Sequence, residues 1–413
     1  MKKIIVLGAS YGQIHLIQIC KKMGCYVIVI GRKEQVPGFE LADRIYYVDI
    51  KEKEYILGIA QKEEIDAILS DQSDYAVPTI AYVSEKMGLR TIGYERALNY
   101  TNKYRMRVKA KLGGINVPCF FKTDEIDILY ENAKRLRYPL IMKPIDSAGS
   151  RGIHKIVSEE ELAEAFYDSR AFSTTGEVIV EEYISGKEYI VDGFGIENQY
   201  INLDIGEKEY FDIKDTYISK RCIFISADMI TNENEKKILD INKKVVSYFG
   251  LPYGITHAEY ILEDVTNKVY LVEIAARGGG IYLSSDLTPR ATGIPTNEYL
   301  VEYVLYGKNK DIKNFKLQKR VTAWMCFELA PGTISRISGV SRICEIKGVF
   351  KVCLDNIYIG KKILPLKNDL GKYGPILVEA DSREKCCEIM SEVRKTLKIE
   401  TIDIVGKKQG IIW

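Results

Sequence analysis

Short apolar runs alternate with helical patterns over the first part of the chain. Lys3–Leu7, Cys25–Ile30 and Ala67–Ser70 are almost wholly apolar, as strands buried on both faces of a parallel sheet are. Between them, Gln13–Met23 and Tyr55–Lys62 repeat apolar residues at the spacing of a helix that buries one side. This alternation predicts βαβ units, and hence an α/β domain with a parallel sheet over residues 1–95.

The stretch Val178–Asp192 combines β-rich apolar residues with acidic ones. Its pattern predicts two strands of a hairpin joined by a tight turn at Ser185-Gly186, with Glu181 near the end of the first strand and Glu188 at the start of the second. Apolar strand faces suit a purine ring, and two carboxylates can accept hydrogen bonds from amino and hydroxyl groups. A buried hairpin with exposed glutamates is the alternative interpretation.

A second stretch, Val269–Gly280, alternates like a strand and then becomes polar. Glu273 ends the alternation, and Arg277 and three glycines follow. A carboxylate beside an arginine and unobstructed backbone amides suits a metal-bound phosphate and a second anion. Because strands often end in a surface glutamate, this pattern indicates a site only in combination with others.

A lysine and a flexible loop follow another predicted strand. Tyr138–Pro144 predicts a strand that carries Lys143 near its end, and Ser147–Gly152 is rich in small residues. Backbone amides without large side chains can fold over phosphates while an ammonium group balances their charge. A Gly/Ser turn between two strands is the other interpretation. Upstream, Lys103–Leu112 predicts a basic helix that ends at Gly113-Gly114.

The polar segment Asp71–Asp74 follows the third apolar run of the chain. At the carboxyl edge of a parallel sheet such residues bind ligands, although a helix cap uses the same residue types. Leu283–Thr292 predicts a loop that covers a substrate or is simply solvated. Further predictions are helices over Thr123–Arg137 (capped by Thr123), Asn232–Phe249, Pro295–Tyr306 and Ser382–Leu397, and strands over Tyr253–Leu262, Lys268–Ala275 and Val321–Leu329.

Composition narrows the class of protein. With 413 residues, of which 46% are hydrophobic and 28% charged, the chain is too long for one core and predicts several domains. A net charge of +2 gives no indication of nucleic acid or membrane as a partner, and no apolar run approaches the roughly 18 residues of a membrane span. Nine cysteines without a C-x-x-C motif predict reduced thiols in a cytoplasmic protein.

A nicotinamide dinucleotide site is disfavoured. The first strand–helix turn, Gly8–Gly12, lacks the G-x-G-x-x-G pattern. Arg32 stands where such a fold places an acidic residue for the ribose. The parallel domain is therefore expected to serve another purpose.

Taken in order, these motifs resemble the ATP-grasp superfamily. The resemblance covers roughly residues 1–310. It implies an α/β protein with a Rossmann-like parallel βαβ domain at 1–95, an ATP-grasp domain at 96–310 with a lid lobe at about 115–185, and a small β-rich α+β lobe at 318–413 that resembles L-amino-acid ligases more weakly. The motifs are Asn102-Lys103, Tyr138–Pro144, Ser147–Gly152, Glu181-Glu182-Tyr183 with Gly186 and Glu188, and Glu259 fourteen residues before Glu273.

The resemblance also implies roles for individual residues. Lys103 and Lys143 would hold ATP phosphates, and Lys143 and Arg277 would act in catalysis, where Arg277 would stabilise the substrate carboxylate and the tetrahedral state. The other implied roles are a lid for Ser147, Gly149, Ser150 and Gly152; adenine recognition for Glu181 and the backbone of Glu182 and Tyr183; ribose for Glu188; Mg²⁺ or Mn²⁺ for Glu259 and Glu273; and substrate for Gly278 and Gly279. Asp71, from its place at the sheet edge, and Arg221, from its basic segment, are further candidate substrate residues.

Two features depart from the family pattern. Ala275 stands where the family usually has an asparagine, which puts the shell of one magnesium in doubt. Asp212–Ile225 lacks the usual proline-bearing pattern and offers Lys214, Lys220 and Arg221 for a phosphate or a substrate anion. His257 shares a strand face with Glu259. A packed core residue is the preferred interpretation of His257, and a catalytic residue is the alternative.

The predicted function is ATP-dependent ligation of a carboxylate and an amine through an acyl-phosphate, with release of ADP and phosphate. Small-molecule carboxylates and amines are the expected partners, and a homodimer is an expectation from the resemblance. One alternative is a purine-type carboxylating or formyl-activating enzyme. The other is a non-catalytic ATP-binding regulatory protein, which only Ala275 favours.

Overall fold

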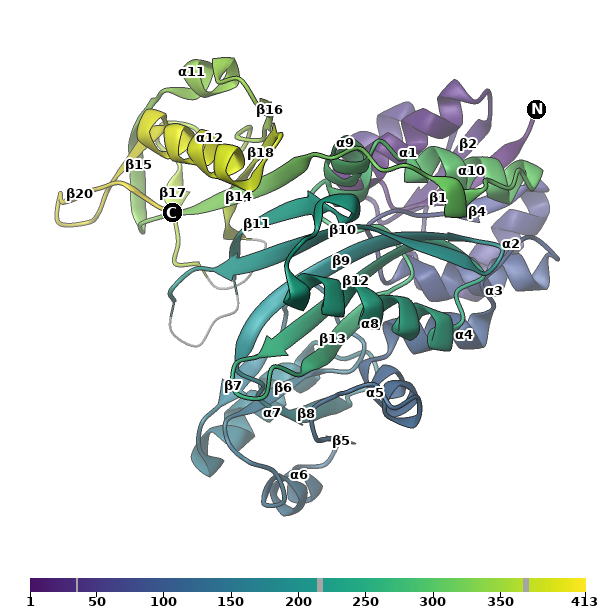
Figure 1. Cartoon of the computed structure of the whole chain (residues 1–413), viewed down its shortest axis with the longest axis horizontal. Helices are drawn as coiled ribbons and strands as arrows, with labels where there is room; N and C mark the ends of the chain where they lie inside the picture. Colours follow the sequence, from purple (N-terminus) through teal and green to yellow (C-terminus); the bar gives the residue numbers. More distant parts are fainter. Residues whose placement is uncertain (35, 214–217, 367–370) are drawn as a thin grey trace. The chain divides into compact units, whose positions relative to one another are not determined.

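A computed structural model describes residues 1–34, 36–213, 218–366 and 371–413 (Figure 1). The chain divides into two compact units. The first comprises Met1–Val117, Ile190–Ile205 and Ile230–Leu317, and the second comprises Pro118–Tyr189, Gly206–Met229 and Gln318–Trp413. Strands β9 (Gly186–Ile196) and β10 (Gln199–Tyr210) therefore contribute to both units. The domain boundaries expected from the sequence remain predictions.

The first unit begins with the predicted parallel sheet, in the order β3-β2-β1-β4. Alternate residues of its strands pack on opposite faces, as a sheet covered on both sides requires. Ile5 and Ile28 pack against α2 and α3, whereas Ile4 and Val27 pack against α1 and α10 (Thr296–Tyr306). The elements are β1 (Lys3–Leu7), α1 (Tyr11–Lys22), β2 (Tyr26–Gly31), η1 (Pro37–Leu41), β3 (Arg44–Tyr47), α2 (Lys53–Glu63), β4 (Ala67–Leu69), α3 (Ala76–Lys86) and α4 (Tyr94–Thr101).

The rest of the first unit is built on the antiparallel pair β12–β13. Helix α8 is amphipathic: Asn232 caps its first turn, Ile238 and Phe249 face the core, and Gly250 ends it with φ +77°. The elements are α5 (Lys103–Leu112), α8 (Glu233–Phe249), β12 (Tyr253–Glu263), β13 (Val269–Ala275), the π-helical turn η4 (Leu283–Leu287), α9 (Thr288–Thr292), α10 (Thr296–Tyr306) and η5 (Ile312–Asn314).

The second unit contains a four-stranded antiparallel sheet in the order β5-β8-β6-β7. Leu129 of α6 and Phe166 of α7 pack against its buried residues, which include Val178 and Val180. The elements are β5 (Phe120–Thr123), α6 (Ile126–Ala133), β6 (Leu140–Pro144), β7 (His154–Ile156), η2 (Glu159–Glu161), α7 (Leu162–Ala171) and β8 (Val178–Glu182).

The C-terminal part of the second unit has two further sets of strands. One continues from β10 in the order β11-β14-β18-β16, and the other has the order β17-β15-β19-β20. The elements are β11 (Ser219–Ser226), η3 (Ala227–Met229), β14 (Val321–Leu329), β15 (Gly332–Ser338), α11 (Val340–Glu345), β16 (Val349–Val352), β17 (Lys362–Ile363), β18 (Tyr373–Ala380), α12 (Arg383–Thr396), β19 (Lys398–Ile402), β20 (Lys408–Gln409) and β21 (Ile411–Ile412).

Three predictions about local structure are wrong. The Val178–Asp192 stretch forms no hairpin, because β8 is buried along its length and pairs with β5 and β6, whereas β9 lies in another sheet. Helix α6 begins at Ile126, since Thr123 ends β5 and its hydroxyl accepts a hydrogen bond from the Glu125 amide. Residues 283–292 are helical, and most of this stretch is buried.

Within the described residues, no helix is both long and apolar enough to cross a membrane.

Candidate active site

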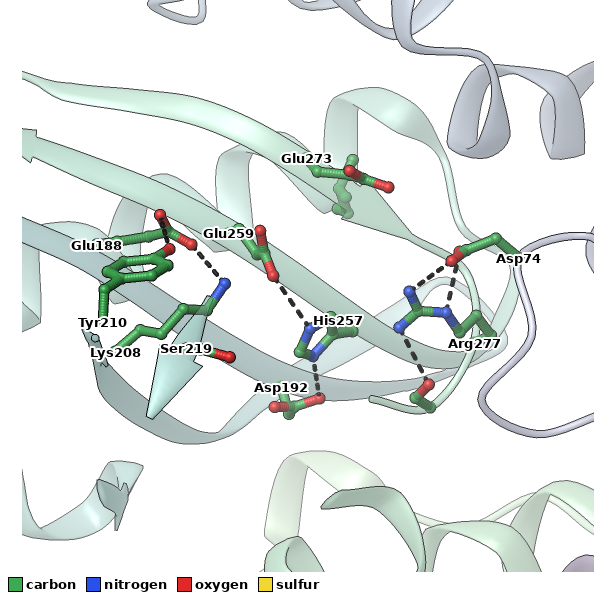
Figure 2. A network of polar contacts seen from close by, with 12 residues as sticks. Asp74, Glu188, Asp192, Lys208, Tyr210, Ser219, His257, Glu259, Glu273 and Arg277 are labelled. Atoms are coloured by element: carbon green, nitrogen blue, oxygen red, sulfur yellow. Dashed lines mark hydrogen bonds and ion pairs between the residues drawn. The ribbon is translucent and has the colours of Figure 1, made fainter. Parts of the chain in front are cut away.

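The two glutamates predicted to bind metal lie on neighbouring strands of the first unit (Figure 2). Glu259 of β12 and Glu273 of β13 are register partners in the antiparallel pair, so their side chains lie on the same face. The register shifts just beyond Glu259, where Tyr260 pairs with Leu271. Both side chains are partly exposed. This arrangement places two carboxylates side by side at the surface of the sheet.

Helix α5 brings Lys103 to this acidic pair. The buried Arg107 donates from Nη2 to the Val272 carbonyl at 2.6 Å, and the Met106 sulfur accepts from the Ile274 amide, so the helix is fixed along β13. As a result, Lys103 Nζ lies 3.7 Å from Glu273 Oε2. The predicted phosphate lysine and the predicted metal ligands are thus brought together.

His257 of β12 lies between a carboxylate of β9 and a carboxylate of its own strand. Its Nδ1 is 3.1 Å from Asp192 Oδ1 of β9, and its Nε2 is 3.7 Å from Glu259 Oε1 (Figure 2). Burial by itself lowers the pKa of the ring, but the charge of Asp192, its hydrogen bond to the ring and the nearby Glu259 carboxylate outweigh burial and raise the pKa to about 9. His257 is therefore a cation that balances part of the negative charge of the neighbouring Asp192 and Glu259.

Asp204 of β10 is the least accessible carboxylate of this cluster, with 0% exposure. Burial, followed by the charge of Asp192, raises the pKa of Asp204 well above the ordinary value and so favours its neutral form. Asp192 and Asp204 are site residues that were not predicted from the sequence. An aspartate inside an apolar strand was the available signal, because a buried carboxylate requires partners.

Arg277 is held by a carboxylate from the parallel domain. Its Nε donates to Asp74 Oδ1 at 2.9 Å, its Nη2 donates to Asp74 Oδ2 at 2.7 Å, and its Nη1 donates to the Gly278 carbonyl at 3.1 Å (Figure 2). Burial raises the pKa of the Asp74 carboxyl, but the charge and hydrogen bonds of Arg277 outweigh burial and lower it. The pair is therefore ionised at neutral pH.

Asp71 is buried beside the glycines that follow Arg277. The Ser284 hydroxyl donates to both Asp71 carboxylate oxygens at 2.9 and 2.8 Å, and Asn297 Nδ2 donates to Oδ2 at 2.9 Å. A Cβ on Gly278 would lie 2.2 Å from Asp71 Oδ1, and one on Gly279 would lie 2.7 Å from His257 Nδ1. A side chain at either position would force these neighbours, or Leu283 at 2.5 Å from the Gly279 position, to move.

In the second unit, the predicted ATP residues Lys143 and Glu181 form a buried ion pair. Lys143 Nζ of β6 lies 2.6 Å from Glu181 Oε2 of β8, and the two side chains are 8% and 4% exposed. Ile141 and Glu181 are register partners, which places Lys143 and Glu181 on one face of the sheet. Such a pair keeps a cation at a fixed position in a region of low dielectric constant.

The neighbouring Glu182 and Tyr183 use their amides within the protein. The Glu182 amide donates to the Cys119 carbonyl and the Tyr183 amide to the Pro139 carbonyl, both at 3.0 Å. The Glu182 carboxylate lies 3.0 Å from Arg137 Nη2. Adenine recognition by this backbone remains a prediction, and these two N–H groups already have acceptors.

Glu188, predicted to bind ribose, contacts a lysine and a tyrosine of β10. Lys208 Nζ lies 2.5 Å from Glu188 Oε1, and the Tyr210 hydroxyl donates to Oε2 (Figure 2). Arg221 of β11 pairs with Glu209 at 2.7 Å. Lys214 lies outside the described residues.

The predicted lid, Ser147–Gly152, has a strongly turned backbone. Gly149, Ser150 and Gly152 have φ values of +73°, +57° and +67°. Ser147 is buried, and the Ser169 hydroxyl donates to the Gly152 carbonyl at 2.7 Å. Its role as a lid remains a prediction.

Among the residues that the structure describes, no group of three or more His, Cys, Asp or Glu side chains is placed to hold a metal ion. Glu259 and Glu273 supply oxygen ligands of the type that Mg²⁺ prefers, and Mg²⁺ commonly takes one or two carboxylates together with waters and phosphate oxygens. The pair therefore suits a metal ion that arrives with a phosphate ligand.

Comparison with known proteins gives a family match and two relatives of similar sequence. Residues 136–285 match the family model described as an ATP-grasp domain. A formate-dependent phosphoribosylglycinamide formyltransferase from Methanocella arvoryzae is 24% identical over 67% of this chain and 66% of that protein. The carbamoyl phosphate synthase large chain of Clostridium beijerinckii is 20% identical over 75% of this chain and 30% of that protein.

A solved structure resembles nearly the whole chain. The crystal structure of an L-amino acid ligase from Bacillus licheniformis superposes with a TM-score of 0.81 at 21% identity, over 97% of this chain and 98% of that one. By contrast, the aligned part of this chain spans just under two thirds of the formyltransferase and less than one third of the synthase large chain.

Proposed function

From the premise that the chain carries an ATP-grasp domain and has the ATP-grasp fold predicted from its sequence, we propose that it is an ATP-dependent ligase that joins a carboxylate to an amine. A carboxylate resists attack by an amine at neutral pH because its leaving group is poor. Phosphorylation by ATP would make it electrophilic, and ADP and phosphate would be released. The protein's task is then mainly charge compensation and positioning.

The main support for this proposal is the pairing of two glutamates on the neighbouring strands β12 and β13. Glu259 and Glu273 would hold Mg²⁺, which would supply positive charge to offset the negative charge of the phosphates. Lys103, 3.7 Å from Glu273, would meet a phosphate beside the metal. His257 would stay protonated and limit the repulsion between the carboxylates around it. The proposal assigns nucleotide binding in the second unit to Lys143, Glu181 and Glu188, with Ser147–Gly152 as the lid.

Arg277 and the glycines after it would bind the acyl group. A guanidinium group and open backbone amides can stabilise the negative charge that develops on a carboxylate oxygen during amine attack. The acyl donor and the amine are proposed to be small metabolites, with an amino acid as the first candidate because of the likeness to an L-amino acid ligase fold. Homodimerisation and a cytoplasmic location are part of the proposal.

A second candidate function is formyl or carboxyl activation of a purine intermediate. The similarity to a formate-dependent formyltransferase favours it. Formate and bicarbonate therefore belong among the acyl donors that are tested. A purely ATP-binding role would follow if Ala275 leaves the metal site unable to support turnover.

The proposal is tested by measuring ADP and phosphate release with Mg-ATP across a matrix of carboxylates and amines. Release that requires one specific pair, and is lost in Glu273→Ala, would support the ligase. The matched control is Glu263→Gln at the end of β12, which should leave release unchanged. Release with formate or bicarbonate alone would favour the second candidate. If ATP binds but no substrate stimulates release, the ligase proposal is wrong.

A further inference from the structure

Asp74 accepts two hydrogen bonds from one edge of the Arg277 guanidinium group. Nε and Nη2 form the side-on fork of an arginine, and both donate to the same carboxylate, at 2.9 and 2.7 Å. Nη1 adds a bond to the Gly278 carbonyl at 3.1 Å. These three bonds engage three of the five N–H groups and fix the plane of the guanidinium. Among the described residues, they leave one N–H on each terminal nitrogen for a ligand.

The carboxylate that accepts these bonds, Asp74, belongs to a polar segment that contacts the turn after β13 at several points. Asp74 holds Arg277, and Asp71, three residues earlier, holds Ser284 and Asn297. Gly278 lies between these contacts, because a Cβ there would meet Asp71 Oδ1 and Ser284. One polar segment of the parallel domain thus contacts both flanks of the glycine turn.

From this geometry we infer that Asp74 is a positioning residue of the ligase reaction, which orients Arg277 toward the substrate anion without touching the substrate itself. The inference rests on the proposed function and extends it. Asp71 has the same kind of role toward Ser284, since its carboxylate oxygens are occupied by protein donors. The parallel domain contributes to ligation by setting the direction of a cation.

The charge of Asp74 gives this role a kinetic signature. The side chains of Arg277 and Asp74 are only 14% and 16% exposed, so their mutual attraction is weakly screened. Asp74 lowers the attraction of Arg277 for a ground-state carboxylate, while it aligns the remaining N–H groups for the charge of the transition state. Loss of the Asp74 charge should therefore lower kcat and leave KM for the carboxylate unchanged or lower.

The first test is Asp74→Asn, which keeps the shape and removes the charge. We expect kcat to fall roughly 10-fold to 100-fold, with KM for ATP unchanged. In a double-mutant cycle, Asp74→Asn should cost nothing further once Arg277 is replaced by lysine. The control is Asp49→Asn, whose carboxylate accepts from Nε and Nη2 of Arg32 in the same domain and should leave kinetics unchanged.

A second readout does not depend on activity. The rate at which phenylglyoxal modifies Arg277, followed by mass spectrometry, should rise in Asp74→Asn and stay unchanged in Asp49→Asn. If the wild type shows no ligase activity, the proposed function fails, and the labelling still decides whether Asp74 holds Arg277. If Asp74→Asn does not fold, Asp74→Glu displaces the guanidinium by one methylene and should give the same kinetic pattern.

Two outcomes would overturn the inference. One is an active Asp74→Asn variant with wild-type kcat and unchanged labelling of Arg277. The other is a loss in kcat that adds fully to the loss from Arg277→Lys, because Asp74 would then act independently of Arg277.

Discussion

His257 illustrates how partners decide the charge of a buried residue. From the sequence, a lone histidine on an apolar strand is interpreted as core packing. In the structure it has Asp192 on one ring nitrogen and Glu259 near the other. Burial lowers the pKa of His257, but Asp192 and Glu259 together raise it by more, so the ring is protonated at neutral pH.

This protonation should make stability depend on pH. The pKa of His257 is raised from 6.5 to about 9, so its contribution is fully present below pH 6.5 and is lost as the pH rises through 9. The shift corresponds to at most roughly 3 kcal/mol. Thermal unfolding of metal-free protein between pH 6.5 and 9.5 should therefore show a decrease in melting temperature that is much smaller in His257→Gln.

Asp192→Asn provides a second check, because it removes the charge that raises the pKa of His257. Its melting temperature should also vary little across this pH range. Curves for wild type and both variants that run parallel would show that His257 does not titrate in this way.

At the scale of elements, the turn between β13 and α9 contains several residues with unusual backbone conformations. Three glycines are followed by Ile281 and Tyr282 with φ values of +54° and +59°, and a π-helical turn begins at Leu283. Non-glycine residues rarely adopt positive φ, and such conformations persist where surrounding contacts impose them. Here the contacts of Asp71 with Ser284 and Asn297 supply that constraint.

The glycines of this turn should differ sharply in how well they tolerate substitution by alanine. In Gly278→Ala the new methyl group would lie 2.2 Å from Asp71 Oδ1 and 2.4 Å from Ser284, so we expect a destabilisation of about 1–3 kcal/mol and a large loss of ligase activity. In Gly280→Ala the methyl group meets no atom within 4 Å, and the change should be nearly silent. Melting temperature and phosphate release measure both effects; equal behaviour of the two variants would contradict the close approach.

At the scale of the whole molecule, the C-terminal residues complete a core that begins earlier in the second unit. Ile223 of β11 packs with Ala323, Val378 and Met390 from beyond residue 318, and β11 pairs with β14 along Arg221–Ile225. The lysine-rich stretch Lys308–Lys319 suggests a linker between independent domains. The strand pairing instead ties the C-terminal residues to β11.

Truncation after Leu317 should therefore impair folding. It would expose the edge of β11 and the buried side chain of Ile223, and an unpaired apolar strand edge promotes association between chains. We expect the truncated chain to aggregate in size-exclusion chromatography and light scattering. A truncated chain that stays monomeric, with a wild-type far-UV spectrum for the remaining residues, would show that this part folds independently.

The local pattern of the sequence determined much of the fold. Apolar runs located β1, β2, β4, β12, β13 and β14, and the bounds of α5 and β14 agree with the prediction to the residue. The motif order indicated the ATP-grasp fold because it combines short segments whose chemistry is local. The short turn between β12 and β13 predicts that the two strands pair, but it does not place Glu259 opposite Glu273. Continued from Leu262 and Val269, the register would pair Glu259 with Val272, and the shift next to Glu259 brings Glu273 opposite it instead.

Contacts between distant segments were decided only by the tertiary structure. The pairing of β8 with β5 and β6, the grip of Asp74 on Arg277, 203 residues away, and the meeting of Asp192 with His257 have no periodic signal in the chain. Periodicity reports which face of an element is buried, but it does not report which element covers that face. The charge state and orientation of His257 and Arg277 depend on that choice, because each is set by a carboxylate that folding brings from another strand or loop.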